Sequence, residues 1–542
     1  MKKIIALSAV AFLSTAVYAA DADLQSQVEQ LSKKLERLTK KVGEVNAQAA
    51  KDNIKFDVDF RTAVDKIEYE TLGTGALGKQ TYKNTGVWSN RLWLNMGYAP
   101  TDNMVFKGQL AYNKAFGAAP IGAAGSFAGG ETFSVPQRGF GFDTFDWISS
   151  ETLNDDKIRV REAYWLWMPK IGDIGFTASI GRRPSTNGYL ANLREDDPKA
   201  KSPLGHVINM EFDGASAGIK LDKYVPGMMF KLCLGRGLTN AKAWANEADF
   251  TLSSYMSPTS PSYIEDANAL DTIDMYGFIF VPYDDGQYAL KTTWYRGKNV
   301  PGMVGSFTID AAGPAFAMDQ SWAMDTIGDM DGMAASLKID GIGNEISDFL
   351  DETTFFASYA MSKSRPHARS GDMMTMTPAA GALMALMPAA QQQMMGSLMS
   401  VLDTGAMMGS DKEQTGHSYW LGINTPNLTG GRFGLEYNHG DKYWRPFTYG
   451  EDTLVGSKLA TRGSAIEAYW SQPLIDDVFS MQVRYTSIKY DYTGSNGFFG
   501  DGGTPYSMSE ARQLNQLFGM LGGAYDPVEK AQDLRVYFRY RY

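Results

Sequence analysis

The chain has 542 residues, a formal net charge of −10 and a hydrophobic content of 44%. Its mean hydropathy of −0.27 excludes a membrane protein made of many apolar helices, because each such helix needs roughly 20 consecutive apolar residues. The negative charge argues against nucleic acid as the main partner, and the single cysteine, Cys233, excludes a disulfide framework and a cysteine-rich metal site.

Residues 1–19 have the pattern of a secretory signal peptide. Lys2 and Lys3 form the positive end, an apolar run follows from Ile4 to Val17, and small residues precede a cleavage site after Ala19 or Ala20. The apolar run is too short to span a membrane as an anchor. We therefore predict an exported protein.

Residues 20–52 follow a heptad pattern with an apolar residue at alternating spacings of four and three. The seam residues are Leu24, Val28, Leu31, Leu35, Leu38, Val42 and Val45. About three heptads are marginal for an isolated helix, so the segment needs a partner. We expect a periplasmic coiled coil that joins copies of the chain, with a trimer as one option. A lone amphipathic helix is the alternative; it would lie on the barrel that residues 53–542 predict below, or on another envelope component.

From residue 53 onward the apolar pattern changes to period 2, which is typical of strands that have two different faces. The last strand shows it most clearly, because Leu534, Val536, Phe538, Tyr540 and Tyr542 alternate with three arginines and Tyr537. Aromatic residues make up 12% of the chain, and 56 glycines suit many turns. This segment resembles the closing strand of bacterial outer-membrane barrels, and the resemblance implies that the barrel-assembly machinery reads its aromatic end.

Short turns alternate strictly with long polar segments along residues 53–542. The expected long segments are 66–87, 115–157, 185–205, 237–273, 298–331, 364–416, 441–463 and 491–531. Short periplasmic turns, long external loops and an even strand count are the pattern of bacterial outer-membrane barrels. We therefore predict an all-β transmembrane barrel of about 16 antiparallel strands, wide enough for an aqueous channel.

Strand parity places a set of charged side chains on the inner face of this barrel. The candidates for lining the pore are Lys55, Asp57, Asp59, Arg61, Arg91, Lys107, Arg535, Arg539 and Arg541. Opposed cations and anions across a pore order water and sort solutes by charge, although many of them can simply pair along the wall. The faces of residues 159–162 and 181–184 are ambiguous, which is consistent with β-bulges.

The chain contains no recognisable catalytic, nucleotide-binding or metal-binding motif, so we expect no enzyme, metal or cofactor. Residues 373–402 carry no charge and eight methionines. We expect a loop helix there that folds into the mouth or lumen, where it could gate the channel; a disordered external loop is the alternative. A second loop helix is expected at residues 509–521, with Ser507 and Glu510 as its capping box.

The motif from Gly434 to Trp444 and the short run Thr461-Arg462-Gly463-Ser464 resemble a bacterial family known as a domain of unknown function and regarded as outer-membrane porins. The resemblance implies a barrel with an N-terminal coiled coil and brings no catalytic residues. We expect passive diffusion of small hydrophilic solutes through a charged lumen in the outer membrane. The alternatives are a substrate-specific channel gated by loop 364–416, a plugged barrel that acts as an adhesin or structural anchor, and a hydrolase at the rim.

Overall fold

The computed structural model describes residues 54–73, 78–118, 146–148, 150–153, 156–183, 185–197, 199–241, 264–265, 270–312, 315–343, 346–367, 374–393, 396, 408, 410–494, 504–520 and 526–542. The signal peptide at 1–19 and the coiled coil at 20–52, with its whole seam, lie outside these residues and stay predictions.

A single sheet of 18 strands contains two short additions, β5 (Lys170–Ile171) and β15 (Met374–Met376), and the other 16 strands form a closed antiparallel barrel. The barrel strands are β1 (Lys55–Thr71), β2 (Thr81–Thr101), β3 (Met104–Ala115), β4 (Arg159–Trp167), β6 (Ile174–Arg183), β9 (Phe212–Lys220), β10 (Met229–Leu238), β11 (Ile273–Asp284), β12 (Tyr288–Ala312), β13 (Ala315–Asp340), β14 (Thr354–Pro366), β16 (Gln414–Pro426), β17 (Arg432–Gly440), β18 (Gly463–Ile475), β19 (Phe479–Tyr490) and β20 (Val528–Arg541).

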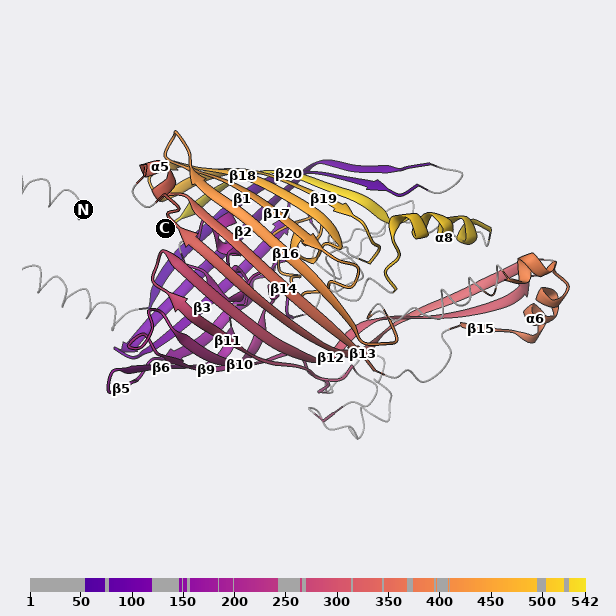
Figure 1. Cartoon of the computed structure of the whole chain (residues 1–542), viewed down its shortest axis with the longest axis horizontal. Coiled ribbons are helices and arrows are strands. Elements are labelled where there is room, and N and C mark those ends of the chain that lie inside the picture. Colours follow the sequence, from indigo (N-terminus) through magenta and orange to yellow (C-terminus); the bar gives the residue numbers. More distant parts are fainter. Residues whose placement is uncertain are drawn as a thin grey trace, which may run out of the picture.

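The last strand closes the barrel against the first, with Asp59 opposite Arg541 and Arg61 opposite Arg539. Their pairing leaves the barrel without a free sheet edge, which a strand in lipid cannot have. The short turns lie at one end of the barrel together with the C-terminus, and the strands cross the barrel at a steep tilt (Figure 1). The expected fold class is confirmed.

The outer face of the barrel is apolar and the inner face is polar. On β20, Leu534 and Phe538 are 42% and 45% exposed, whereas Arg535 and Arg539 are each 2% exposed. Leu421, Leu435, Ile466 and Trp470 continue the exposed apolar surface on β16, β17 and β18. Apolar side chains pointing away from a sheet with charged residues behind it are the pattern of a barrel in a lipid bilayer.

Residues 298–331, which we expected to be a loop, instead extend β12 and β13 into a two-stranded arm. Their pairing continues from Tyr288–Ile339 to Ala312–Ala315, with register shifts near Val300. Figure 1 shows this arm projecting far beyond the end of the barrel opposite the short turns. Pro301 lies at this register shift, where the ladder of backbone hydrogen bonds is already interrupted.

The methionine-rich segment is attached to this arm, so its predicted place in the mouth or lumen is wrong for residues 374–393. β15 pairs in parallel with residues 307–309 of β12, and helix α6 (Pro378–Ala385) follows at the tip of the arm (Figure 1). Thr377 caps α6 by accepting from the Ala380 amide, and its hydroxyl donates to Asp310 at 2.6 Å. The edge of a two-stranded ribbon has unpaired backbone N–H and C=O groups, and β15 pairs with such an edge.

Helix α8 (Met508–Met520) forms in the last long segment, close to the expected bounds. The Ser507 amide donates to Glu510 at 2.7 Å, and the Glu510 amide donates to the Ser507 hydroxyl at 3.2 Å. This reciprocal pair is a capping box, which satisfies two amides that a helix start leaves without partners. The capping-box prediction is confirmed.

Two segments that we expected outside, 185–205 and 441–463, fold mainly into the barrel instead. The described residues of 185–211 and 441–462 are together called the insert below. They contain β7 (Gly188–Tyr189), α3 (Ala191–Arg194), β8 (Lys201–Leu204) and the 3-10 helix η3 (Lys458–Ala460). The Asn209 amide donates to Phe447 O at 2.6 Å, the Phe447 amide to Val207 O at 2.9 Å, and the Gly450 amide to Asn209 O at 2.6 Å. The two halves are therefore one unit.

The insert has an apolar core of its own, packed against the barrel wall. Its buried members include Leu190, Val207, Met210, Trp444 and Phe447. Burying such side chains is worth roughly 1.5–3 kcal/mol each, which explains why these segments leave the solvent. The expectation of an open interior is wrong for the part of the lumen that the insert occupies.

A charged residue on the outer face tests the membrane assignment. Leu421 lies at the middle of β16 and is 40% exposed, so Leu421→Arg places a cation in lipid. We expect the free energy of folding into lipid vesicles to become less favourable by about 2–4 kcal/mol. Urea titration of the heat-modifiable folded form measures the loss. Leu428→Arg, in the turn before β17 and fully exposed, is the matched control and should fold normally; equal behaviour of the two variants would contradict a lipid-facing β16.

Candidate functional site

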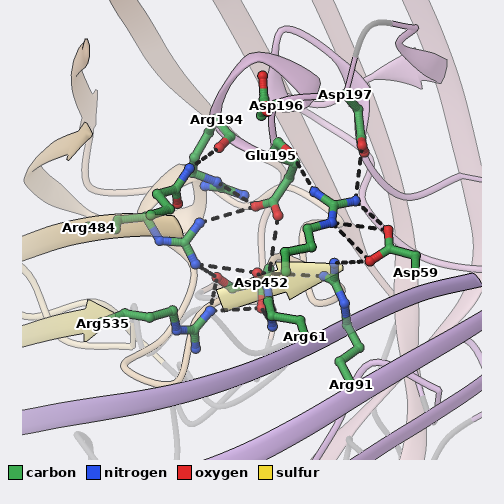
Figure 2. A network of polar contacts seen from close by, with 12 residues as sticks. Asp59, Arg61, Arg91, Arg194, Glu195, Asp196, Asp197, Asp452, Arg484 and Arg535 are labelled. Atoms are coloured by element: carbon green, nitrogen blue, oxygen red, sulfur yellow. Dashed lines mark hydrogen bonds and ion pairs between the residues drawn. The ribbon is translucent and has the colours of Figure 1, made fainter. Parts of the chain in front are cut away.

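The insert presents acidic groups to a row of arginines on the barrel wall. Helix α3 ends in Arg194, and Glu195, Asp196 and Asp197 follow it directly, so one short turn supplies four charged residues. Asp452 comes from the other half of the insert. Figure 2 shows these residues meeting guanidinium groups from β1, β2, β19 and β20.

Asp452 is the centre of the network. Its carboxylate accepts from Arg61 at 2.9 Å and from Arg535 at 2.9 Å, and Arg484 lies 3.3 Å away. Its backbone carbonyl accepts from Arg484 at 2.8 Å. Although burial opposes ionisation, Arg61, Arg535 and Arg484 together hold the pKa of Asp452 well below its ordinary value. Asp452 is therefore an anion that ties one half of the insert to three strands.

Glu195 ties the other half of the insert to the same wall. Its carboxylate accepts from Arg194 at 3.0 Å and from Arg484 at 3.1 Å, so Arg484 joins Glu195 to Asp452. Burial and the Asp452 charge raise the pKa of Glu195, but Arg484, Arg194 and Arg91 outweigh them and leave it below the ordinary value. Both halves of the insert are thus held by ionised carboxylates.

Arg539 extends the network to the turn after α3. It donates to Asp59 at 2.9 Å across the β1–β20 seam, to Asp197 at 3.1 Å and to the Glu195 carbonyl at 2.6 Å. Arg541 donates to the Asp196 carbonyl at 2.9 Å. The seam that closes the barrel is therefore also the seat of the insert.

A second cluster holds the start of β9. Glu211 accepts from Arg182 at 2.7 Å and from the Ser150 hydroxyl, and Arg161 Nε lies 3.4 Å from it. Burial raises the pKa of Glu211 to about 7, with Glu151 adding to the rise and Arg161 and Arg182 opposing it. Arg161 lies at a register shift between β3 and β4, as a β-bulge in residues 159–162 would give. Gly181 has a φ of +125°, but the pairing of residues 181–183 continues without a register shift.

His206 joins the insert to two strands of the opposite wall. Its Nδ1 lies 2.8 Å from the Ser358 hydroxyl on β14, and its Nε2 lies 3.0 Å from the Ser418 hydroxyl on β16. The ring is fully buried between Trp420 and Trp444. Burial lowers the pKa of His206 to about 3, so the imidazole is neutral in the folded protein.

Among the residues predicted to line the pore, the structure brings Asp59, Arg61, Arg91, Arg535 and Arg539 together inside the barrel, and all five are buried. Lys55, Asp57 and Lys107 share their inward parity but are exposed near the end that carries the turns, and Arg541 is half-buried there. Whether a conducting path passes these residues stays a prediction.

The partners Glu195, Asp452 and Arg484 were missed by the sequence analysis. Arg484 alternates with apolar residues and could have been found by strand parity, whereas the two acids lie in segments without periodicity.

In the described part of the chain, no group of three or more His, Cys, Asp or Glu side chains is arranged to hold a metal ion. No helix among these residues is long and apolar enough to cross a membrane.

The sequence motif Gly434–Trp444 begins in β17 and continues into the insert. Trp444 Nε1 donates to the Leu459 carbonyl at 2.7 Å, and Arg462 Nε donates to the Trp444 carbonyl at 3.0 Å. A Cβ at Gly440 would lie 2.3 Å from the Thr461 carbonyl, so only glycine fits there. Both motifs therefore hold the second half of the insert at its two ends.

The family model for proteins of unknown function called DUF3373 matches residues 81–542. The chain belongs to this family. The match contains most of the barrel, the whole insert and both motifs, so the features described above lie within the family region, apart from β1. No curated protein matches the chain.

Solved barrels resemble the family member only distantly. OprB of Pseudomonas putida shares 10% identity over 92% of this chain and 97% of its own, with a TM-score of 0.40. An anion-selective porin from Comamonas acidovorans shares 10% identity over 90% of this chain and 99% of its own, also at 0.40. The outer membrane protein OmpT of Vibrio cholerae, in a loop-deletion form, shares 8% identity over 90% of this chain and 99% of its own, with a TM-score of 0.38. The barrel assignment rests on the strand pairing itself.

Removing the central anion should release the insert. Asp452→Asn leaves Arg61, Arg484 and Arg535 without their shared counter-charge, and breaking a buried ion pair on one side costs about 3–5 kcal/mol. Hydrogen exchange should accelerate in residues 441–462 while the strands stay protected. The exposed Asp411→Asn serves as the matched control. Unchanged protection in both variants would contradict the anchoring role.

Acid should loosen the insert at His206. The unfolded imidazole takes up a proton near pH 6.5, whereas the buried ring has a pKa of about 3. The group's contribution is therefore complete above pH 6.5 and falls by about 1.4 kcal/mol per pH unit between those values. Exchange rates of residues 204–211, corrected for intrinsic pH dependence, measure this. His206→Gln should flatten the dependence; an equally steep fall in the variant would assign it to other groups.

Proposed function

We propose that this protein is an outer-membrane channel for the passive diffusion of small hydrophilic solutes, narrowed by the insert. The observation that carries the proposal is the reversal of polarity across the wall: an apolar outer face and charged side chains inside 16 strands. A barrel of that size has room for water in addition to folded segments. The exposed inward cations Lys55 and Lys107 are what a wet entrance would contain.

The same proposal includes how the chain is exported, inserted into the outer membrane and assembled. Export through a cleaved signal peptide at 1–19 delivers the chain, and the aromatic strand ending at Tyr542 addresses it to the barrel-assembly machinery. The heptad segment at 20–52 joins copies at the periplasmic end, in a homo-oligomer for which a trimer is one option. Lipid surrounds the apolar face, and small hydrophilic solutes are the cargo.

A plugged barrel that displays the arm is the second candidate. Two observations favour it. Ion pairs fix the insert to the barrel wall, and the arm formed by β12 and β13 projects beyond the barrel with α6 at its tip (Figure 1). An adhesin or anchor would need the arm and no open path. Gating from inside the lumen by residues 374–393 has no support in the structure, because β15 pairs with the arm and α6 follows at its tip.

Single-channel recording of the folded protein in a planar bilayer, before and after shortening the arm, separates the two candidates. We expect discrete current steps, unchanged when residues 302–325 and the attached segment 370–396 are each replaced by short glycine-serine turns, because the proposed path lies in the barrel. Three equal steps per insertion would support a trimer. Silence of heat-modifiable, folded protein, with binding to cells lost on shortening, would favour the plugged barrel.

A further inference from the structure

The inner face of one sector of the barrel wall carries mainly small side chains. In register across β6, β9 and β10 lie Thr177, Gly218 and Lys231, followed by Ser179, Ser216 and Cys233. The inward direction is shown by Phe212, which packs within 3.1 Å of the Cβ position of Gly235, and by Leu232 and Leu234, which are 54% and 63% exposed on the outside. Small residues leave space between this wall and the insert.

Two inward cations of this sector, Arg183 and Lys231, have no carboxylate partner within the described part of the chain. The Arg183 guanidinium lies 5.0 Å from the Tyr164 ring centroid, and its NH1 atom is buried without a hydrogen-bond partner. The nearby acid Glu162 is already bound to Lys201 and lies 3.6 Å from Arg161. The groups that interact electrostatically with Lys231 are Cys233, Arg183 and Lys220, none of them a carboxylate.

Arg183 also borders a cavity of about 70 Å³ between this wall and the insert. Pro203 and Ile208 line it from the insert, and Ser216, Cys233 and Thr293 line it from the wall. Thr293 is 3% exposed, and its hydroxyl has no hydrogen-bond partner. The residues lining the cavity include one cation and no acid. The space is enough for several water molecules or one small anion.

An unpaired guanidinium in a partly buried site is costly unless a counter-charge reaches it. Elsewhere in the barrel the arginines of the network obtain that charge from the insert, as Arg535 does from Asp452 at 2.9 Å. Arg183 has no such neighbour, and its planar fork suits the two oxygens of a carboxylate or the oxygens of a phosphate.

We propose that the solute path runs along the inner face of β6, β9 and β10, that Arg183 and Lys231 make it select anions, and that a small oxyanion, a carboxylate or phosphate, binds at Arg183. This inference rests on the proposed channel function and specifies its cargo. The space comes from the small side chains, the selection from two uncompensated cations, and the binding site from the guanidinium beside the cavity.

Reversal potentials under a KCl gradient, recorded for the full chain in planar bilayers, test the selection. We expect the native channel to prefer chloride, Arg183→Gln and Lys231→Gln to weaken that preference, and the double variant to lose it. Arg236→Gln is the matched control, because Arg236 lies on β10 beyond Lys231, is exposed and is paired with Asp274 at 2.7 Å. It should keep the native preference.

Block of the chloride current by inorganic phosphate and, separately, by acetate tests the binding site. Arg183→Gln should raise the half-blocking concentration at least about tenfold, because it removes charge-assisted hydrogen bonds. Arg183→Lys should keep the chloride preference and weaken the block, since it retains the charge and loses the fork. Block by phosphate alone or by acetate alone identifies the oxyanion.

The outcomes are distinguishable. A silent bilayer from folded protein overturns the channel and this inference with it. An open channel that prefers cations, or one whose chloride preference falls as much in Arg236→Gln as in Arg183→Gln, overturns the inference alone. Heat-modifiable migration of each variant on a gel shows whether it is folded. If Arg183→Gln does not fold, the block of Arg183→Lys by phosphate and acetate still tests the binding site.

Discussion

A buried guanidinium needs an anion, and this requirement organises the inside of the barrel. The wall supplies arginines on β1, β2, β19 and β20, too close together to be compensated by the strand acids alone. The insert brings the missing carboxylates, Glu195 and Asp452, and Arg484 binds both of them. Replacing either partner by a neutral residue would leave buried charge unpaired, so the wall and the insert stabilise one another.

Apolar burial holds one side of the insert against the barrel wall, and ion pairs hold the other side. Towards β14 and β16 the insert packs Trp444 and Phe447 into an apolar cluster, with His206 bound by two hydroxyls. Towards β1 and β20 it is held by ion pairs of Asp452 with Arg61 and of Asp197 with Arg539. Between these contacts, the wall of β6, β9 and β10 is lined by small side chains and is bordered by two cations without acids. This wall, beside the insert rather than through it, is where we propose the solute path.

Much of the barrel could be predicted because strand parity is a local property of sequence. The alternation from Leu534 to Tyr542 showed which side chains face lipid, and it placed Arg535 and Arg539 inside. Parity could not find their partners, because Asp452 and Glu195 lie in irregular segments whose position depends on contacts hundreds of residues away. The arm was missed for a related reason: a two-stranded ribbon buries little, so its residues do not show the strong alternation of a wall strand.

The pairing of Asp59 with Arg539 joins positions near the two ends of the barrel sequence, and Asp452 binds arginines from both ends. The seat of the insert therefore does not exist until the final strand has been added. Until β20 pairs with β1, Glu195 and Asp452 lack part of their arginine wall, because Arg535 and Arg539 belong to that last strand. The ion pairs between the insert and β20 therefore depend on barrel closure, whereas the contacts of the insert with β14 and β16 do not.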